Sequence, residues 1–284
     1  GTLRKSDVTG AVASLKPKEI TNLPVSRTDQ ALQGRITGVN IQNDNASPNA
    51  DVRIRIRGSN SLLGNNNPLI VVDGFQDGNL NWVHPNDIAS IEVLKDASAL
   101  AIYGAKGANG AVLVSTLSGN TSEEPHFNYS TYLAAHQIRN KLETMNAAQY
   151  ARRQNQDALE LGGTPPFSEE EVAHFTATGG TDWQDEIFRT TIAMNHHLTL
   201  SGGSNKMKYF ISGDVFDQQG IVIGSEFNRY SVRANLSIQP TDKLSLQLNT
   251  FLTRSNDRPI TLNSFSGENA GSPINSALLW SPTD

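Results

Sequence analysis

Two loops of the sequence are rich in side chains that can bind a polar ligand. Residues 43–51 combine asparagine with aspartate, and residues 75–85 add Phe75 and Trp82 to the same polar types. Amides and carboxylates hydrogen-bond hydroxyl or peptide groups, and an indole ring stacks on a flat apolar surface. The mixture suits an oligosaccharide and a peptide equally well, provided that the loops line a concave site.

Other polar motifs have less specific spacing. Asp77, Asn79 and Asn81 repeat the opening of a calcium loop, but Trp82 stands where that loop needs glycine and Ile88 where it needs a bidentate glutamate. A solvated loop is therefore the expected structure. His196 and His197 are adjacent, so in a strand they face opposite sides and cannot share one metal ion.

The sequence contains no catalytic constellation with specific spacing. Three glycines, Gly104, Gly107 and Gly110, resemble a phosphate loop, but they follow a helical segment and lead into a strand, which reverses the order of a dinucleotide fingerprint. A tight turn with close backbone packing explains them. We expect no enzyme activity, no cofactor and no metal site.

Composition narrows the class of protein. The chain has 284 residues, no cysteine and a formal charge of -5, and this acidity argues against nucleic-acid binding. No apolar stretch is long enough for a membrane-spanning helix, and the start of the chain carries no signal peptide. Strands of a membrane barrel alternate polar and apolar residues, so they escape such a search.

The first part of the chain, residues 1–119, reads as a compact α+β unit. Breakers separate two short helices, starting near Thr28 and at Ala97, from short strands. We expect Thr28 to be the N-cap of the first helix. The expected strands are residues 11–15, 39–42, 52–57, 69–72, 88–94 and 112–116. Residues 118–125 are polar and form the best linker candidate.

Beyond the linker, residues 126–284 contain long segments of period 2. In residues 244–253, leucines at 244, 246, 248 and 252 alternate with polar residues, and residues 230–239 repeat the pattern. Residues 127–139, 197–202 and 208–218 are weaker examples. Helical patches at residues 146–161 and 182–188 interrupt the first long connection. The clearest segments have about the length of a tilted membrane strand, roughly 9–11 residues.

Long and short connections alternate between these strands, as in an outer-membrane barrel with external loops and periplasmic turns. Membrane barrels of a single chain start at about 8 strands. The five expected strands are too few, so we expect this sequence to be part of a longer protein. A non-transporting, soluble β-rich binding or adhesion protein is the alternative, and it would carry mixed residues on both strand faces.

Several motifs of the first part resemble SusC/RagA-type TonB-linked outer-membrane transporters. They are Asp29-Gln-Ala-Leu-Gln-Gly-Arg-Ile-Thr-Gly-Val39, Ile54-Arg-Ile-Arg-Gly-Ser59, Pro68-Leu-Ile-Val-Val-Asp-Gly74 and the run from Asp87 to Gly110. The resemblance implies an α+β plug domain followed by antiparallel transmembrane β-barrel strands, here as an incomplete barrel. It also implies nutrient uptake across the outer membrane, TonB docking at a Ton box upstream of Gly1, and a SusD-like surface lipoprotein as partner.

The resemblance also orients the loops. If the plug strands run antiparallel, residues 43–51 and 75–85 lie on the outward side and form the plug's half of an oligosaccharide or peptide site. The candidate ligand-binding residues are Asn43, Asp44, Asn45, Asn49, Phe75, Gln76, Asp77, Asn79, Asn81 and Trp82. Trp82 is the best single candidate, although it could instead pack the plug against the wall.

Three arginines share one face of an expected strand. Arg53, Arg55 and Arg57 alternate with apolar residues, and guanidinium groups form two-pronged contacts with carboxylates. In a plug that sits inside a polar lumen, we expect these arginines to meet carboxylates on the barrel wall. The outer leucines of residues 244–252 are expected to face lipid.

Overall fold

The computed structural model describes residues 12–15, 27–43, 47–50, 52–56, 58, 66–76, 78–122, 124–260 and 272–283. Contacts divide the chain into two compact units. The first unit comprises residues 1–134, 193–217 and 228–256, and the second comprises residues 135–192, 218–227 and 257–284. Each unit is described by itself.

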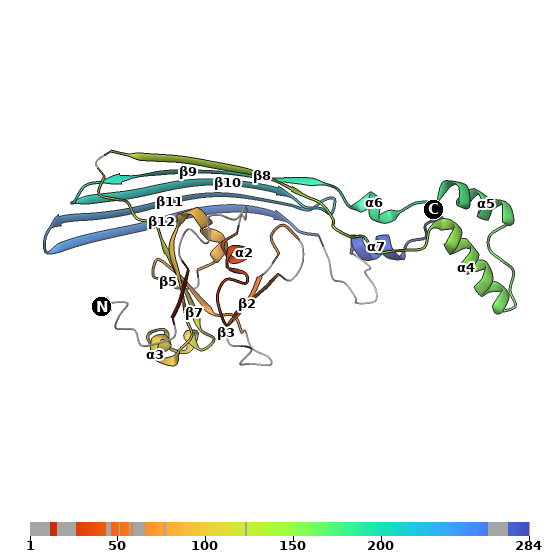
Figure 1. Cartoon of the computed structure of the whole chain (residues 1–284), viewed down its shortest axis with the longest axis horizontal. Helices are drawn as coiled ribbons and strands as arrows, with labels where there is room; N and C mark the ends of the chain where they lie inside the picture. Colours follow the sequence, from red (N-terminus) through yellow and green to blue (C-terminus); the bar gives the residue numbers. More distant parts are fainter. Residues whose placement is uncertain are drawn as a thin grey trace. The chain divides into compact units, whose positions relative to one another are not determined.

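A mixed sheet forms the centre of the α+β region, residues 12–116. Among the described residues its strand order is β1-β6-β7-β4-β5, with β4 and β7 parallel and the other pairs antiparallel. Figure 1 labels β5 and β7 of this sheet. Runs rich in β-branched residues form the three inner strands, β6, β7 and β4, because such side chains fit a surface covered on both faces. The strands are β1 (Val12–Leu15), β4 (Leu69–Val72), β5 (Phe75–Gln76), β6 (Ile88–Leu94) and β7 (Ala111–Thr116).

A hairpin and short helices complete this region. Strands β2 (Val39–Asn43) and β3 (Val52–Ile56) pair antiparallel, and their buried isoleucines join the core beneath helix α2 (Thr28–Leu32). Two 3-10 turns, η2 (Leu80–Trp82) and η3 (Pro85–Asp87), lead into β6. The core includes Ile41, Ile54, Leu80, Val83, Ile88, Ile91, Val93, Val112 and Val114.

The glycine run that resembles a phosphate loop is a packed turn. Helix α3 (Ala97–Leu100) continues as η4 (Ala101–Gly107), which leads into β7. Gly110 has a φ of 91°, and an added Cβ would lie 2.8 Å from Ile56 Cδ1. Close packing therefore requires glycine at this position, as the reading of a tight turn predicts.

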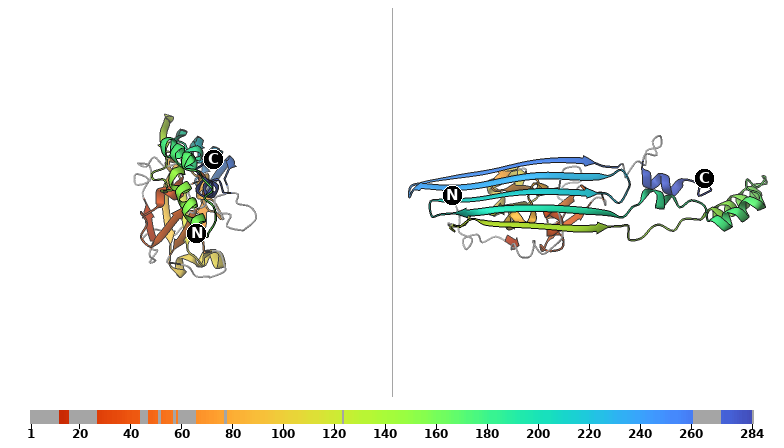
Figure 2. Two further views of the ribbon diagram at one scale, coloured as in Figure 1. Left: turned by 90° about the vertical axis from the view of Figure 1, so that its right-hand side faces the viewer. Right: turned by 90° about the horizontal axis from the view of Figure 1, so that it is seen from above.

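Five long strands lie side by side in chain order, in a second sheet that the described residues form (Figure 2). Short turns at residues 204–206 and 242–243 each join two neighbouring strands, which therefore run antiparallel. This long-strand sheet consists of β8 (His126–His136), β9 (Thr191–Gly203), β10 (Met207–Gln219), β11 (Glu226–Thr241) and β12 (Leu244–Arg258). The α+β fold followed by antiparallel strands confirms the predicted fold class.

Alternation sorts the residues of the long-strand sheet onto two faces. Leu246, Leu248, Val232 and Ile211 are exposed. On the other face, Ser212, Arg233 and Phe251 contact the α+β region. This face assignment agrees with the prediction from period 2. It places apolar side chains on the side away from the α+β region.

The second unit contains helices that lie between β8 and β9 and after β12 in the sequence. Helix α4 (Ala147–Glu160) and helix α5 (Glu169–Thr178) each begin with a complete capping box, in which the side chains of the N-cap and third residues bond each other's backbone N–H. Helices α6 (Trp183–Ile187) and α7 (Pro273–Leu279) follow, and the Trp183 indole donates to the Ser281 carbonyl at 2.8 Å. Within the described part of the chain, no helix has the length and apolarity to cross a membrane.

Three expectations about local structure are wrong. The plug strands are not uniformly antiparallel, because β4 and β7 run parallel through a connection that includes β6. Arg27, not Thr28, is the N-cap of α2, and the Thr28 hydroxyl instead donates to the Val83 carbonyl at 2.7 Å. Helix α5 was not predicted, although Ser168 and Glu171 form a capping box at its start.

Candidate functional site

The α+β region contacts the long-strand sheet mainly through polar side chains. Asp73 follows β4 with a φ of 48°, a left-handed conformation that aspartate tolerates better than most residues. Its carboxylate accepts from the Thr116 N–H at 2.8 Å and from the Thr116 hydroxyl at 2.6 Å. The same carboxylate pairs with Arg233 of β11 at 3.1 Å. Asp73 therefore closes a turn and joins the two sheets.

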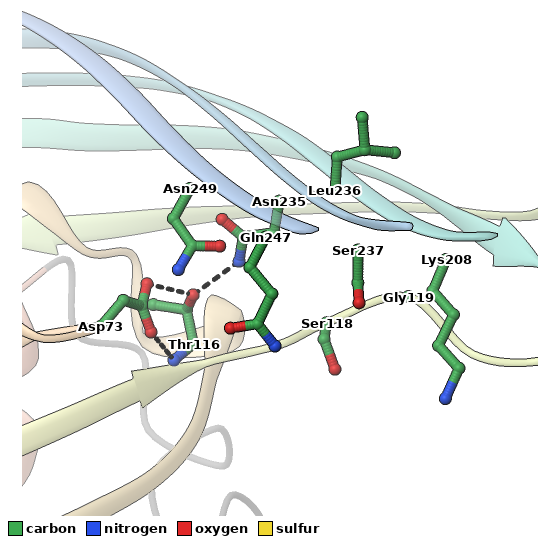
Figure 3. A pocket seen from close by; sticks show the side chains of 10 residues that line it. All are labelled: Asp73, Thr116, Ser118, Gly119, Lys208, Asn235, Leu236, Ser237, Gln247 and Asn249. Atoms are coloured by element: carbon green, nitrogen blue, oxygen red, sulfur yellow. Dashed lines mark hydrogen bonds between the residues drawn. The ribbon is translucent and has the colours of Figure 1, made fainter. Parts of the chain in front are cut away.

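A polar cavity of about 120 Å³ lies beside this contact (Figure 3). Asn235 donates to the Thr116 hydroxyl at 2.7 Å and to the Leu117 carbonyl at 2.8 Å. Gln247 and Asn249 of β12 point toward the same space, whereas Leu236 points to the opposite side of the sheet. The cavity is lined by Asp73, Thr116, Ser118, Gly119, Lys208, Asn235, Leu236, Ser237, Gln247 and Asn249.

A second buried contact places two imidazole rings and one guanidinium group around two carboxylates. We call it the His–Asp cluster, and its members are His84, Asp87, Asn195, His197, Asp214 and Arg229. All six are at least nine-tenths buried. His84 and Asp87 belong to the α+β region, and the other four belong to strands β9, β10 and β11.

Asp214 is the centre of the His–Asp cluster. One carboxylate oxygen accepts from Asn195 at 2.6 Å and the other from Arg229 at 3.0 Å. The two imidazoles stack with their centroids 3.9 Å apart. Each places a nitrogen near Asp214 Oδ2, at 3.6 Å for His84 Nε2 and at 3.8 Å for His197 Nδ1.

Asp87 is the carboxylate that the α+β region contributes. Its Oδ2 accepts from the Ser212 hydroxyl of β10 at 2.6 Å. Its Oδ1 lies 3.0 Å from His197 Nε2. The contact therefore crosses from η3 to two neighbouring strands.

The protonation of His84 follows from its hydrogen bonds. Its Nδ1 accepts from the Asn86 N–H at 3.1 Å, so the proton of the neutral ring lies on Nε2, which faces the Asn195 amide oxygen at 3.2 Å. Burial lowers the pKa of His84 to about 4, against the opposing effect of Asp214. The ring is therefore neutral at neutral pH.

The same hydrogen bonds bear on metal binding. His84, His197 and Asp214 offer three potential ligand atoms within 4.8 Å of one another. A metal on His84 Nε2 would require Nδ1 to carry the proton, but Nδ1 already accepts the Asn86 N–H. The second oxygen of Asp214 also faces the Arg229 cation. The donor set therefore fits a hydrogen-bonded cluster better than a metal ion.

Three aromatic rings form a further contact. Trp82 of η2 stacks on Phe251 of β12 with centroids 5.3 Å apart, and Phe75 meets the same Phe251 edge-on at 6.2 Å. The Arg233 guanidinium lies over the Phe251 ring at 5.6 Å. Trp82 is half-buried by this packing, whereas Phe75 remains 55% exposed.

The remaining ligand candidates are scattered. Asn43 and Gln76 are exposed, and Asn49 is half-buried, with its side-chain oxygen 3.5 Å from Arg27 Nη1. Asn79 accepts from the Asn81 N–H as the cap of η2, and the Asn81 carbonyl accepts from Arg229 at 2.8 Å. Asp44, Asn45 and Asp77 lie outside the described residues.

The predicted arginine contacts stay a prediction. On β3, Arg53 is exposed and Arg55 is half-buried, opposite the buried Ile54 and Ile56, and Arg57 lies outside the described residues.

One described ion pair runs in the opposite direction to the one expected. Arg233 of β11 pairs with Asp73 of the α+β region. Arg229 pairs with Asp214, which is itself a strand residue, and Asp87 accepts from Ser212 and lies near His197. Charged residues at inward positions of otherwise alternating strands were the signal that could have revealed them.

Comparison with known proteins identifies the family. A family model described as TonB-dependent Receptor Plug Domain matches residues 4–111. The chain is 39% identical over 284 residues to the TonB-dependent receptor P3 of Formosa agariphila, covering 99% of the chain and 27% of that protein. It is 33% identical over 246 residues to the TonB-dependent receptor SusC of Bacteroides thetaiotaomicron, covering 84% of the chain and 24% of SusC.

A solved structure of the RagAB peptide importer in its open-open state matches 95% of the chain and 33% of the solved chain, with a TM-score of 0.83 and 27% identity. The chain carries the plug domain and barrel strands of a SusC/RagA-type TonB-dependent receptor. Its strands belong to the outer membrane. The siderophore receptor PirA of Acinetobacter baumannii shares the fold alone, with a TM-score of 0.58 at 19% identity.

The chain spans about a quarter of the length of the curated relatives that it matches. Hereafter the α+β region is called the plug, and the long-strand sheet is called the wall. The predicted boundaries, residues 1–119 for the plug and 126–284 for the barrel, stay predictions.

Proposed function

We propose that this receptor imports oligosaccharides or peptides across the outer membrane, with the plug gating the barrel lumen. The observation that carries the proposal is the polar contact between plug and wall. A permanently fixed domain would be held by an apolar interface, whereas charged and amide groups can exchange their partners for water when the plug moves. The transport step involves no covalent chemistry.

The energy source and partner follow from the family. TonB would pull on a Ton box upstream of Gly1, and a SusD-like surface lipoprotein would cover the external opening. The relatives named as TonB-dependent receptors and the RagAB importer support both assignments. The polar and aromatic side chains of the loops suit an oligosaccharide and a peptide equally well.

The plug's part of the ligand site would be the loops at residues 43–51 and 75–85. Phe75 supports this proposal because it combines an exposed ring with a fixed position against Phe251. Trp82 keeps one role in packing, since its ring already stacks on Phe251. Gln76 and Asn43 belong to these loops, are exposed and can reach hydroxyl or peptide groups.

Uptake by the full-length receptor tests the function. Cells that express it in a strain without other importers should accumulate labelled oligosaccharide or peptide, and deletion of TonB should abolish the accumulation. Uptake that continues without TonB would contradict the proposed gating. Equal uptake of both ligand classes at the level of empty cells would contradict import altogether.

Calorimetry of the purified full-length receptor tests the ligand site. We expect Phe75→Ala and Trp82→Ala each to weaken ligand binding by about 1–2 kcal/mol, because each removes aromatic contact area. Phe127→Ala is the matched control, since Phe127 is an exposed ring on β8 of the wall. Unchanged affinity in both plug variants, with a folded plug, would move the site to the external loops of the barrel.

A further inference from the structure

In the His–Asp cluster, the hydrogen bonds of His84 leave neither ring nitrogen available for a second proton. The Nδ1 of His84 accepts the Asn86 N–H, and this bond caps the 3-10 turn η3. Protonating Nδ1 would set two N–H groups against each other and break the cap. The Nε2 proton already points toward Asn195 and Asp214.

The charged and titratable groups that face His84 lie on η3, β9, β10 and β11. Asp87 on η3 and Asp214 on β10 are the facing carboxylates, while His197 on β9 and Arg229 on β11 are the facing basic groups. Asp214 already holds Arg229 and Asn195, so its charge is largely committed. A second cation at His84 would therefore add an uncompensated charge in a buried site.

We propose that His84 makes the seating of the plug proton-sensitive: the plug packs against the wall only while this ring is neutral, so acid weakens the contact. When the plug leaves the wall, the His84 ring is solvated and can take up a proton. When the plug is packed against the wall, the ring stays neutral. The seated state therefore binds fewer protons, and its stability falls as the pH falls.

The pH window follows from the two states of the ring. The pKa of His84 is lowered from 6.5 to about 4 in the seated plug, chiefly by burial. The stabilisation from a neutral His84 is complete above about pH 6.5 and is lost progressively toward pH 4. Between pH 7.5 and pH 5.0 the equilibrium between seated and released plug should shift roughly 30-fold toward release.

Hydrogen exchange of the full-length receptor in detergent measures this equilibrium. Protection factors of plug amides, corrected for the intrinsic effect of pH on exchange, should fall roughly 30-fold from pH 7.5 to pH 5.0. His84→Gln should remove most of this decline, since an amide does not titrate. His197→Gln should keep the decline, and His196→Gln is the matched control because His196 points to the exposed face beside Tyr129.

Three outcomes would overturn the proposal. The first is protection in the wild type that stays flat or rises toward pH 5.0, a result that decides the question even if His84→Gln fails to assemble. The second is a decline that disappears in His197→Gln and persists in His84→Gln. The third is a plug that zinc stabilises in the wild type but not in His84→Gln, which would assign the cluster to a metal ion.

Discussion

Single residues of the wall hold the plug through buried charge. Asp214 collects an arginine, an amide and two imidazole nitrogens at one point, and its side chain is 4% exposed. In such a site the pair contributes less than its geometry suggests, because both ions lose water when the plug is seated. Removing one partner is a different matter, since the other charge stays buried and alone.

We therefore expect Asp214→Asn to destabilise the seated plug by about 3–5 kcal/mol, because Arg229 would lose its counterion. The measurement is the urea concentration at which plug amides lose protection in the full-length receptor. Asp242→Asn is the matched control, since Asp242 lies in an exposed turn of the same region. A double variant, Asp214→Asn with Arg229→Met, should recover part of the loss; equal loss in the single and double variants would contradict the pairing argument.

The sequence could predict the faces of the strands but not the partners across the contact. Period 2 placed Leu246 and Leu248 on one face because alternation is a local property of a strand. The pairing of Asp73 with Arg233 joins residues 160 positions apart, and no local pattern encodes it. Asp73 stands in the Val-Asp-Gly motif with a left-handed φ, which fits a turn at the end of a strand but does not indicate the pairing with Arg233.

At the scale of elements, the strands of the wall separate two environments. On β12 the leucines at 246 and 248 are exposed, while Gln247, Asn249 and Phe251 on the opposite face meet the plug or its cavity. The same strand thus carries exposed leucines on one face and mainly polar side chains on the other. This division is what a barrel strand of an outer-membrane receptor requires.

We expect Leu248→Arg to impair insertion of the barrel, because a charge on the lipid face costs about 2–4 kcal/mol near the bilayer centre. Ser245→Arg is the matched control on the opposite face of β12. The measurement is the temperature at which the folded receptor loses its shifted mobility in a detergent gel. Equal effects of the two substitutions would show that β12 does not separate lipid from lumen.

At the scale of the whole molecule, the short segment between β7 and β8 connects the plug to the wall and is hydrogen-bonded to the wall. The Gly203 N–H donates to the Ser122 carbonyl at 2.9 Å, so the turn after β9 holds the chain that leaves β7. An added Cβ on Gly119 would lie 2.3 Å from the Tyr209 backbone. The connection therefore passes directly against the start of β10.

We expect Gly203→Ala to be poorly tolerated. Gly203 has a φ of 149°, and an added Cβ would lie 2.2 Å from the Met207 carbonyl oxygen and 2.9 Å from the Asn120 carbonyl oxygen, both backbone atoms. Gly202→Ala should be milder, because its Cβ would meet the far end of the Tyr209 side chain, which can move. Limited proteolysis of residues 117–125 compares the two variants, and equal cleavage rates would contradict the packing argument.

The polar contact between plug and wall has one more consequence. Asp73, Asp87, Asp214 and Arg233 are all groups that water solvates well, so each surface can be wetted as soon as the two part. An entirely apolar interface would expose apolar patches on both surfaces after separation, and such patches favour misfolding of the detached domain. The carboxylate and guanidinium part of the contact instead leaves groups that water can solvate on both surfaces, while the aromatic contact of Phe75, Trp82 and Phe251 exposes apolar rings. If the plug leaves the wall as proposed, such surfaces favour its return to the same position over aggregation.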